Sequence, residues 1–358
     1  MRVLCVGTEY PPATRGGYEQ QCADLVAHLR ARGHAVRVLS GAGRRCPTDA
    51  GVHRQLPRFP VRPVPTSRAA AAAAERRSAT VLERHLAAFA PDVVCWWRLG
   101  ELSQSLVARV AARGLPAVGV VCDTWMEDGP SRDPWCRITG RRPSFDGVRW
   151  LCCSDWLRRR LGLPDADVVH PGVDSQAFFE RPSAPPWRGR LLYAGRLSRM
   201  KGVGDAYAAL ARLPGATLSV IGHGDPPRPH RRLRVEPAID RAALGARMRA
   251  TDVLLFPVRW DEPWGLVPLE AMACAVPVVA TATGGAAEYL RDETNALLVP
   301  PGDPPAIARA VRRLAGDEAL RSRLVAGGRR TAAAASLAAA NGAVHAVLAE
   351  AVAGNVAA

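Results

Sequence analysis

Apolar positions in the first part of the chain follow two different periodicities. Residues 2–7 form a short apolar run that is typical of a buried strand. After a loop rich in proline and glycine, apolar side chains recur at helical spacing between Tyr18 and Leu29, and residues 36–40 form a second apolar run. We therefore predict a β-loop-α-β unit, whose two parallel strands are joined by a right-handed crossover.

The same alternation continues toward the middle of the chain. Residues 93–97 and 117–122 are predicted strands, and residues 99–113 are predicted to form the helix between them. The alanine-rich residues 69–88 are predicted to form one long helix, because leucines still mark an apolar face on it. Strands that alternate with helices in this way predict a parallel sheet covered by helices.

A second series of strands and helices follows the proline-punctuated residues 171–187. Its predicted strands lie over residues 190–195, 216–221, 252–256 and 277–281. The economical interpretation is two parallel α/β domains joined near residues 171–187. Open parallel sheets bind ligands beyond the carboxyl ends of their strands, so two such domains that face each other are expected to form a ligand-binding cleft.

Composition excludes several other classes of protein. A chain of 358 residues that is 48% hydrophobic can bury the cores of two or three domains. It has no uninterrupted run of about 18 apolar residues, so we predict no membrane-spanning helix. The first residues lack the pattern of a secretory signal, and we expect a cytoplasmic protein. The nine cysteines are an odd number and lie mostly in apolar runs, which favours buried thiols over disulfides.

The net charge of +15 raises the alternative of a protein that binds nucleic acid or a membrane surface, because basic surfaces attract phosphate. The arginines are scattered in short clusters that neither interleave with aromatic residues nor gather on one helix face. We therefore favour solvated basic faces and a small phosphate-bearing ligand, and we expect no nucleic-acid partner.

A diphosphate would fit the turn after the strand predicted at residues 190–195. This turn contains Gly195, Gly202 and three cations, among them Arg196 and Lys201. Glycine permits a close backbone approach, the start of the next helix offers free N–H groups, and the cations supply charge-assisted hydrogen bonds to phosphate oxygens. Taken alone, a basic turn of this kind is equally compatible with a solvated surface loop.

Two carboxylates stand eight residues apart around the start of another predicted helix. Pro263 keeps Glu262 in the loop, whereas Glu270 lies in the first turns of the helix. Fixed carboxylates accept hydrogen bonds from sugar and ribose hydroxyls. The alternative is acidic residues that complement the helix dipole, which explains one glutamate more easily than both.

Together these residues resemble the retaining family-4 glycosyltransferases. The C-terminal domain of that family carries a Gly-Arg-Leu turn, then Lys-Gly, then Glu-x7-Glu, and this chain has them at residues 195–197, residues 201–202, and Glu262 with Glu270. The resemblance covers nearly the whole chain. It extends to Gly16, Gly17, residues 154–157, residues 172–174, residues 222–224, Gly284, Gly285 and Glu288.

The resemblance implies the GT-B fold, an α/β architecture of two Rossmann-like domains whose parallel sheets face an interdomain cleft. Residues 1–170 would bind the acceptor and residues 171–330 the nucleotide sugar. Residues 331–358 would form a C-terminal helix that crosses back to the N-terminal domain. The implied activity is transfer of a hexosyl group from a nucleotide-diphosphate sugar with retention of the anomeric configuration, so that the acceptor attacks the face from which the nucleotide leaves.

The resemblance also implies a role for each site residue. Arg196 and Lys201 would hold the donor diphosphate and neutralise it as it leaves, so that neither a metal nor another cofactor is required. Glu270 would bind the ribose hydroxyls, and Glu262 would hold the transferred sugar. The remaining donor contacts are expected from backbone groups and from glycines that permit close approach. These are Gly16, Gly17, Gly195, Gly224, Trp264, Gly265 and Leu266.

One departure from the family pattern concerns the acceptor side. After the strand predicted at residues 117–122 the family often has a histidine followed by aspartate, and this chain has Cys122 and Asp123. The sugar contact that the histidine would make is therefore in question. Asp123 is expected either to face the acceptor as an orienting group or base, or to cap the following turn.

The resemblance leaves the substrates open. A UDP- or GDP-sugar is the favoured donor, and a small molecule, a natural product or a lipid is the favoured acceptor class. Peripheral contact with a membrane is compatible with a lipid acceptor. The alternatives are a GT-B enzyme that epimerises or hydrolyses the nucleotide sugar, or a basic protein that binds nucleic acid or a membrane surface.

Overall fold

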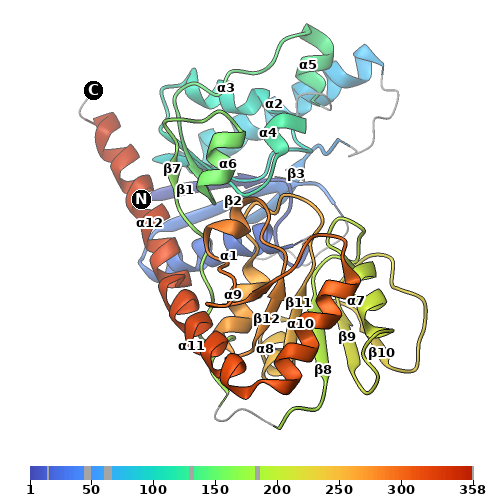
Figure 1. Ribbon diagram of the computed structural model, residues 1–358. Helices are drawn as coiled ribbons and strands as arrows, with labels where there is room; N and C mark the ends of the chain where they lie inside the picture. The colour runs from blue at the N-terminus through green and yellow to red at the C-terminus, as the bar shows by residue number, and fades with distance from the viewer. Residues whose placement is uncertain (14–15, 44–49, 60–66, 129–132, 182–185, 357–358) are drawn as a thin grey trace. The chain divides into compact units, whose positions relative to one another are not determined.

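The computed structural model describes residues 1–13, 16–43, 50–59, 67–128, 133–181 and 186–356. The chain divides into two compact units. Unit 1 comprises Met1–Val169 and Asn341–Ala358, and unit 2 comprises His170–Ala340. Each unit is built on one parallel sheet with helices packed on it, as Figure 1 shows.

Unit 1 has a seven-stranded sheet in the order β3-β2-β1-β4-β5-β6-β7, and all neighbouring strands are parallel. The strands are β1 (Arg2–Gly7), β2 (Ala35–Gly41), β3 (Val52–Leu56), β4 (Val93–Trp96), β5 (Ala117–Val121), β6 (Val148–Cys152) and β7 (Asp167–Val168). The helices are α1 (Gly17–Ala31), α2 (Arg68–Phe89), α3 (Ser105–Ala111), α4 (Trp125–Asp128), α5 (Pro134–Thr139), α6 (Asp155–Arg160) and most of α12 (Leu337–Val356).

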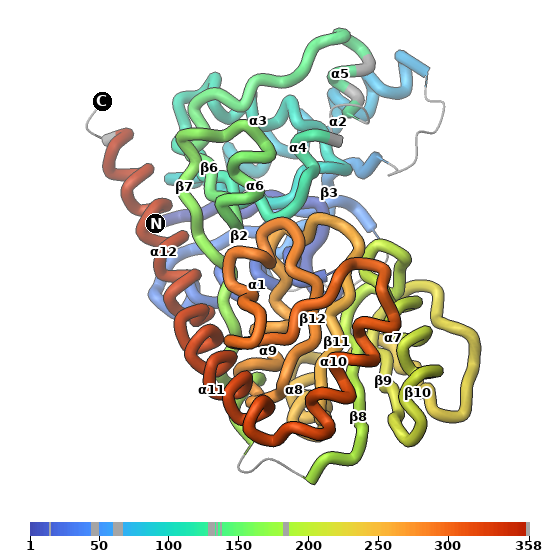
Figure 2. The backbone as a smooth tube through the Cα atoms, in the orientation of Figure 1, coloured from blue at the N-terminus to red at the C-terminus, as the bar shows by residue number. Residues whose placement is uncertain are grey.

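Unit 2 has a six-stranded sheet in the order β10-β9-β8-β11-β12-β13, also with parallel neighbours. The strands are β8 (Arg190–Ala194), β9 (Thr217–Ile221), β10 (Leu233–Glu236), β11 (Val253–Phe256), β12 (Val278–Ala280) and β13 (Leu297–Leu298). The helices are α7 (Val203–Leu210), α8 (Arg241–Arg249), α9 (Leu266–Ala273), α10 (Pro304–Gly316), α11 (Glu318–Ala334) and the 3-10 helix η2 (Gly284–Glu288). Helix α7 packs against α10, and α9 packs against α11, which can be followed in Figure 2.

The two cores lie between the sheets and their helices. Strands β1 and β4 are buried on both faces, as parallel strands covered by helices on both sides must be. In unit 1 the buried core includes Val3, Leu25 and Leu151, and in unit 2 it includes Leu191 and Ile307. Eight cysteines lie in the described residues, and all eight are free thiols.

The structure confirms the α/β class and most of the predicted strands, and it corrects one helix. The helix predicted over residues 99–113 is shorter, because α3 begins only at Ser105. The preceding residues form a buried turn whose polar groups bond to other elements. The backbone N–H of Gln104 donates to Asp133 Oδ2 at 2.6 Å, and the Ser103 hydroxyl donates to Glu75 of α2. These tertiary hydrogen bonds replace the first turns of the predicted helix.

Helix α12 qualifies the prediction of no membrane-spanning helix. Within the described part of the chain it is the one helix that meets the length and composition of a span, over Leu337–Asn355 with a mean hydropathy of 1.3 and 22% of that stretch buried. Polar residues such as Asn341, His345 and Glu350 interrupt it. Its residues Val344 and Leu348 are buried in the core of unit 1. One such helix is weak evidence for a membrane span.

Candidate functional site

The turn after β8 has the sharp backbone that its glycines predict. Gly195 has φ of +143° and Gly202 has φ of +74°, and both values lie in the region that side chains with a Cβ rarely adopt. A Cβ on Gly202 would also overlap the carbonyl of Pro257. The Tyr193 hydroxyl donates to the carbonyl of Arg196 at 2.7 Å and lies 3.3 Å from the carbonyl oxygen of Lys201, so it holds the two ends of the turn together.

The same turn lies against the end of the neighbouring strand β9. The backbone N–H of Leu197 donates to the carbonyl of His223 at 2.7 Å. A Cβ on Gly224 would meet the Leu197 backbone, so this glycine is required for close approach within the protein. Its predicted contact with the donor stays a prediction.

The acidic loop, residues 260–265, follows β11. It is fixed by hydrogen bonds from the residues that follow β12. The Thr283 hydroxyl donates to the carbonyl of Trp260 at 2.7 Å, and the N–H of Gly285 donates to the carbonyl of Glu262 at 2.8 Å. Gly265 has φ of +85° and precedes Leu266, where α9 begins. The segment is therefore a rigid loop that leads into a helix N-terminus.

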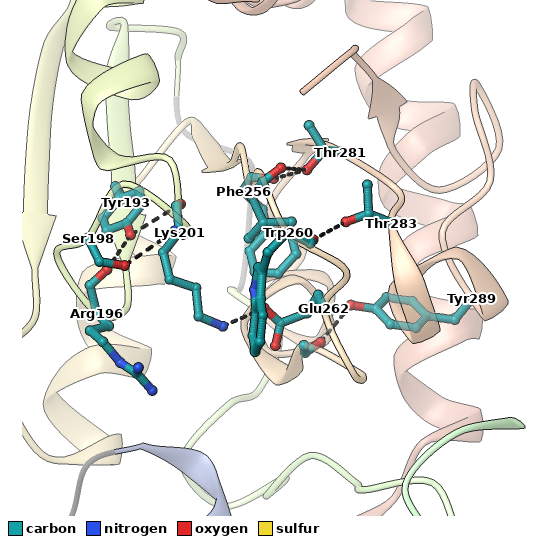
Figure 3. A network of polar contacts seen from close by, with 12 residues as sticks. Tyr193, Arg196, Ser198, Lys201, Phe256, Trp260, Glu262, Thr281, Thr283 and Tyr289 are labelled. Atoms are coloured by element: carbon teal, nitrogen blue, oxygen red, sulfur yellow. Dashed lines mark hydrogen bonds and ion pairs between the residues drawn. The ribbon is translucent and has the colours of Figure 1, made fainter. Parts of the chain in front are cut away.

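The structure brings the two predicted segments into direct contact. The Lys201 ammonium forms an ion pair with Glu262 Oε2, and the indole N–H of Trp260 donates to the same oxygen at 2.8 Å. The Lys201 Nζ atom also lies 5.0 Å from the centre of the Trp260 ring. Figure 3 shows the lysine side chain reaching across from the turn to this loop. The side chain of Glu262 is 9% exposed, so its charge is balanced within the protein.

The two predicted phosphate ligands differ in what they contact. Lys201 is paired, whereas the exposed guanidinium of Arg196 has no hydrogen-bond or ion-pair partner among the residues that the structure describes. In Figure 3 both side chains extend from the turn toward the same side. An anion at this place could therefore bind Arg196 without first breaking an ion pair.

Trp264 is an anchor for the loop. Its ring stacks on His170 with centroids 4.2 Å apart, and it packs against Tyr289 at 5.0 Å. Its indole N–H donates to the carbonyl of Pro171 at 3.1 Å, and the Tyr289 hydroxyl donates to the carbonyl of Gly265 at 2.6 Å. The Trp264 side chain is therefore engaged inside the protein, and the predicted contact of its backbone with the donor stays a prediction.

Glu270 lies in α9 and is almost completely buried. Burial raises the pKa of its carboxyl to about 7, with Arg241 acting in the opposite direction and Asp174 in the same one. A carboxyl with this pKa exists in both protonation states near neutral pH. It can therefore be shifted toward the ionised form by hydroxyl donors of a ligand.

In unit 1 the predicted glycines open helix α1. The N–H of Gly16 donates to Glu19 Oε2 at 3.0 Å, and Gly17 is the first helical residue. A Cβ on Gly16 would meet no atom within 4 Å, so the backbone is open on that side. This openness is compatible with the predicted approach of a ligand.

Of the two alternatives for Asp123, the structure shows the capping of the following turn, and the role toward an acceptor stays a prediction. Its Oδ2 atom lies 3.0 Å from Arg98 Nε, and its Oδ1 accepts a hydrogen bond from the N–H of Trp125 at 3.1 Å. It therefore caps the turn into α4 and is also held by a cation. At the preceding position, a hydrogen bond with Cys153 and burial raise the pKa of the Cys122 thiol. The thiol therefore does not change its protonation state near neutral pH as a histidine would.

Sequence reasoning missed Arg98 and the charged network around it. Its guanidinium lies between Asp123 and Glu19, with Nη1 3.7 Å from Glu19 Oε1. Nearby, Arg58 pairs with Glu9 at 2.8 Å and with Glu101 at 2.6 Å. The available signal was position, because Arg98 lies two residues after the end of β4, and the carboxyl ends of parallel strands are where ligands bind.

Two family models match the chain, one on each unit. The model "Glycosyltransferase Family 4" matches residues 15–177, and the model "Glycosyl transferases group 1" matches residues 188–317. The chain belongs to the GT-B glycosyltransferases. The predicted fold class and the predicted glycosyltransferase class are therefore confirmed, whereas retention of configuration and independence of a metal stay predictions.

Relatives and solved structures agree with this membership. Glycogen synthase of Mycobacterium tuberculosis is 29% identical over 90% of this chain and 88% of its own length. D-inositol 3-phosphate glycosyltransferase 1 of Catenulispora acidiphila is 32% identical over 64% of this chain and 65% of its own. Sucrose-phosphate synthase of Thermosynechococcus elongatus has a TM-score of 0.74 at 20% identity, covering 98% of each chain.

A second solved structure has the same fold and carries a ligand. HepE of Anabaena in complex with UDP-glucose has a TM-score of 0.74 at 17% identity, and it covers 98% of this chain and 100% of its own. At these identities the structures show the fold alone. As for metals, no group of three or more histidine, cysteine or acidic side chains that could hold an ion occurs in the described ranges.

Proposed function

We propose that this glycosyltransferase moves a hexosyl group from a nucleotide-diphosphate sugar to a small-molecule, natural-product or lipid acceptor, with retention of the anomeric configuration and without a metal ion. The contact between Lys201 and Glu262 carries the proposal. It joins the basic turn to the acidic loop, 61 residues further along the chain. In this proposal Lys201 is the cation for the leaving phosphate, and the neighbouring Glu262 accepts a hydrogen bond from a sugar hydroxyl.

The diphosphate would bind at the turn after β8. The guanidinium of Arg196 has no partner among the described residues, and the Lys201 ammonium has three N–H donors, of which the pair with Glu262 uses one. Negative charge grows on the bridging oxygen as the sugar leaves. Two cations at this place therefore stabilise the transition state more strongly than they stabilise the bound donor. In this proposal they take the role that a divalent cation has in other transferases.

The sugar and the ribose would bind to the acidic loop and helix α9. Glu262 would accept from a sugar hydroxyl, assisted by backbone N–H groups at Trp264, Gly265 and Leu266, which lead into the start of the helix. Glu270 would accept from the ribose hydroxyls. Because Glu270 is buried, it needs such donors to be stably ionised.

For the donor we favour a UDP- or GDP-sugar. UDP-glucose is bound in the HepE structure, which supports a uridine nucleotide. On the acceptor side, Asp123 is held by Arg98 in an orientation that could accept a proton or a hydrogen bond from the attacking hydroxyl. A cytoplasmic location fits such a donor, and a lipid acceptor would bring the protein to a membrane surface.

Calorimetric titration in the presence of a chelator tests the proposal. UDP, GDP, ADP and dTDP are titrated first, and then the glucose and mannose conjugates of whichever base binds. We expect one base to bind without metal, and its sugar conjugate to bind as well. Absence of binding by all four nucleotides would reject the donor site, and rapid release of free sugar without an acceptor would favour the hydrolase alternative.

A further inference from the structure

Trp260 lies where the basic turn meets the acidic loop, and neither the motifs nor the proposed roles include it. Its indole N–H donates to Glu262 Oε2 at 2.8 Å, and its ring faces the Lys201 ammonium, which lies 5.0 Å from the ring centre. Its own carbonyl is fixed by the Thr283 hydroxyl at 2.7 Å. The tryptophan is therefore held by the protein and in turn contacts both charged groups, as Figure 3 shows.

Both contacts to Glu262 fall on the same carboxylate oxygen. Trp260 Nε1 and Lys201 Nζ both bond to Oε2, and no hydrogen bond to Oε1 occurs within the described part of the chain. The terminal torsion of a glutamate is soft, so a carboxylate held by a single flexible lysine can rotate. A second donor on a rigid indole fixes the carboxylate plane and leaves Oε1 free to accept from a ligand.

The ring contact has a separate effect on the lysine. An aromatic face attracts an ammonium group without using any of its N–H donors. Lys201 therefore stays next to Glu262 while two of its N–H groups remain available to phosphate oxygens. The indole thus orients the carboxylate with its edge and the ammonium with its face.

We propose that Trp260 is a positioning residue for the transferred sugar, which acts by presenting Glu262 Oε1 to a sugar hydroxyl and by holding Lys201 beside it. This inference rests on the proposed function, because it assumes that Glu262 contacts the sugar and Lys201 the diphosphate. The inference predicts different effects on the affinities for the nucleotide and for the sugar nucleotide, which a purely structural role does not predict. The nucleotide alone does not use Glu262, whereas the sugar nucleotide does.

The test compares Trp260→Phe with a matched control. Phenylalanine keeps an aromatic face for Lys201 and removes the N–H donor. Trp187→Phe is the control, because Trp187 lies in the same unit, is also half-buried and has Arg321 5.6 Å from its ring centre. Each full-length variant is titrated with the nucleoside diphosphate that binds the wild type and with its glucose conjugate, and circular dichroism checks the fold.

We expect Trp260→Phe to lower the affinity for the sugar nucleotide about tenfold, as loss of a hydrogen bond to a charged group does, while affinity for the nucleotide changes by less than about twofold. Trp187→Phe should change neither affinity. Equal loss of both affinities, or loss of neither, would overturn the inference and leave the proposed function standing. If the wild type binds no nucleotide at all, the inference and the proposed function are both rejected.

A double-mutant cycle tests whether Trp260 acts through Glu262. Glu262→Ala should lower affinity for the sugar nucleotide on its own, and Trp260→Phe, which keeps the ring face for Lys201, should have no further effect in that background, because its target is gone. If the second substitution lowers the sugar-nucleotide affinity by the same factor in both backgrounds, Trp260 does not act through Glu262. That result would overturn the inference.

Discussion

The donor side in unit 2 and the charged network in unit 1 are built in opposite ways. In unit 2 the key side chains come from two short segments, each recognisable in the sequence, and they meet through one ion pair between Lys201 and Glu262. In unit 1 the ion pairs join side chains from the ends of different strands and helices, such as Arg98 with Glu19 and Asp123. Local motifs therefore reveal the first arrangement and not the second.

The difference also concerns what each network does. The unit 2 cations include Arg196, which is exposed and without a partner in the described residues, as a site for an anionic ligand requires. The unit 1 cations are already surrounded by carboxylates in the free protein. We infer that the charges in unit 2 are used mainly for binding and catalysis, whereas those in unit 1 also hold the loops at the carboxyl ends of the strands in place.

The largest expected effect tests the unit 2 half of this comparison. Lys201→Ala should lower the release of nucleoside diphosphate from the sugar nucleotide by about 100-fold or more, because a cation that stabilises the leaving group is lost. Arg199→Ala is the matched control, since Arg199 is an exposed cation in the same turn. Steady-state rates and thermal melts measure both. A similar loss of rate in Arg199→Ala would show that only the total charge of the turn matters.

Arg98→Met tests the structural role assigned to the charged network in unit 1. The variant leaves Glu19 and Asp123 without this cation, and because the Arg98 side chain is 24% exposed we expect a loss of about 2 kcal/mol in the free energy of unfolding, less than for a fully buried pair. Affinity for the nucleoside diphosphate should not change. Urea unfolding and calorimetry check the two expectations. Unchanged stability together with weakened nucleotide binding would reverse the roles assigned to the two networks.

Glu270 gives a pH test of the donor side. Its folded pKa of about 7 is above the ordinary value, and ribose hydroxyls favour the carboxylate, so nucleotide binding should release a proton. Affinity for the nucleotide should therefore rise about tenfold between about pH 6 and about pH 8. Titrations in buffers of different ionisation enthalpy measure the proton release. Glu270→Gln should bind more weakly and without this pH dependence, and a wild-type affinity that is constant over this range would contradict the ribose role.

The same carboxyl affects the stability of the free protein with a defined sign. Because its folded pKa is raised, its contribution to stability is fully present below the ordinary glutamate pKa of about 4 and is lost as the pH rises through about 7. Nucleotide should offset this loss at the higher pH. The Glu270→Gln variant should lack this part of the pH dependence.

The smallest effects are expected for a pair of glycines, one from each unit. Gly202→Ala should lower the free energy of unfolding by more than about 1 kcal/mol, because its φ is +74° and a Cβ would overlap Pro257. Gly16→Ala should change it by less than about 0.5 kcal/mol, because its backbone is extended and a Cβ meets no neighbour. Urea unfolding measures both. Equal losses would show that the Gly16 loop is packed more tightly than the structure indicates.

The sequence predicted correctly where the segments of the proposed donor side lie in the fold, because each of them is local. The glycines of the turn, its cations and the two glutamates stand at fixed spacings, so hydrophobic periodicity and side-chain chemistry place them at strand ends and helix starts. Trp260 escaped prediction because its role depends on a contact across 59 residues with Lys201, which no spacing encodes.

The charged network of unit 1 was less predictable, because its contacts are not local. Residues 99–104 have a helical pattern of apolar positions, but the Ser103 hydroxyl bonds to α2 and the backbone N–H of Gln104 bonds to Asp133, the N-cap of α5. The segment therefore forms a buried turn, and α3 starts late. Arg98 acquires its partners only when α1, β4 and β5 come together. Tertiary hydrogen bonds and ion pairs override local propensity at these positions.

The most direct test of the central claim is a crystal structure of the protein with its sugar nucleotide, grown in the presence of a chelator. We predict that the diphosphate oxygens lie within hydrogen-bond distance, about 3 Å, of Arg196 and Lys201, with a sugar hydroxyl on Glu262 and the ribose on Glu270. A diphosphate bound elsewhere, or bound at this turn only when a divalent cation is supplied, would contradict the claim.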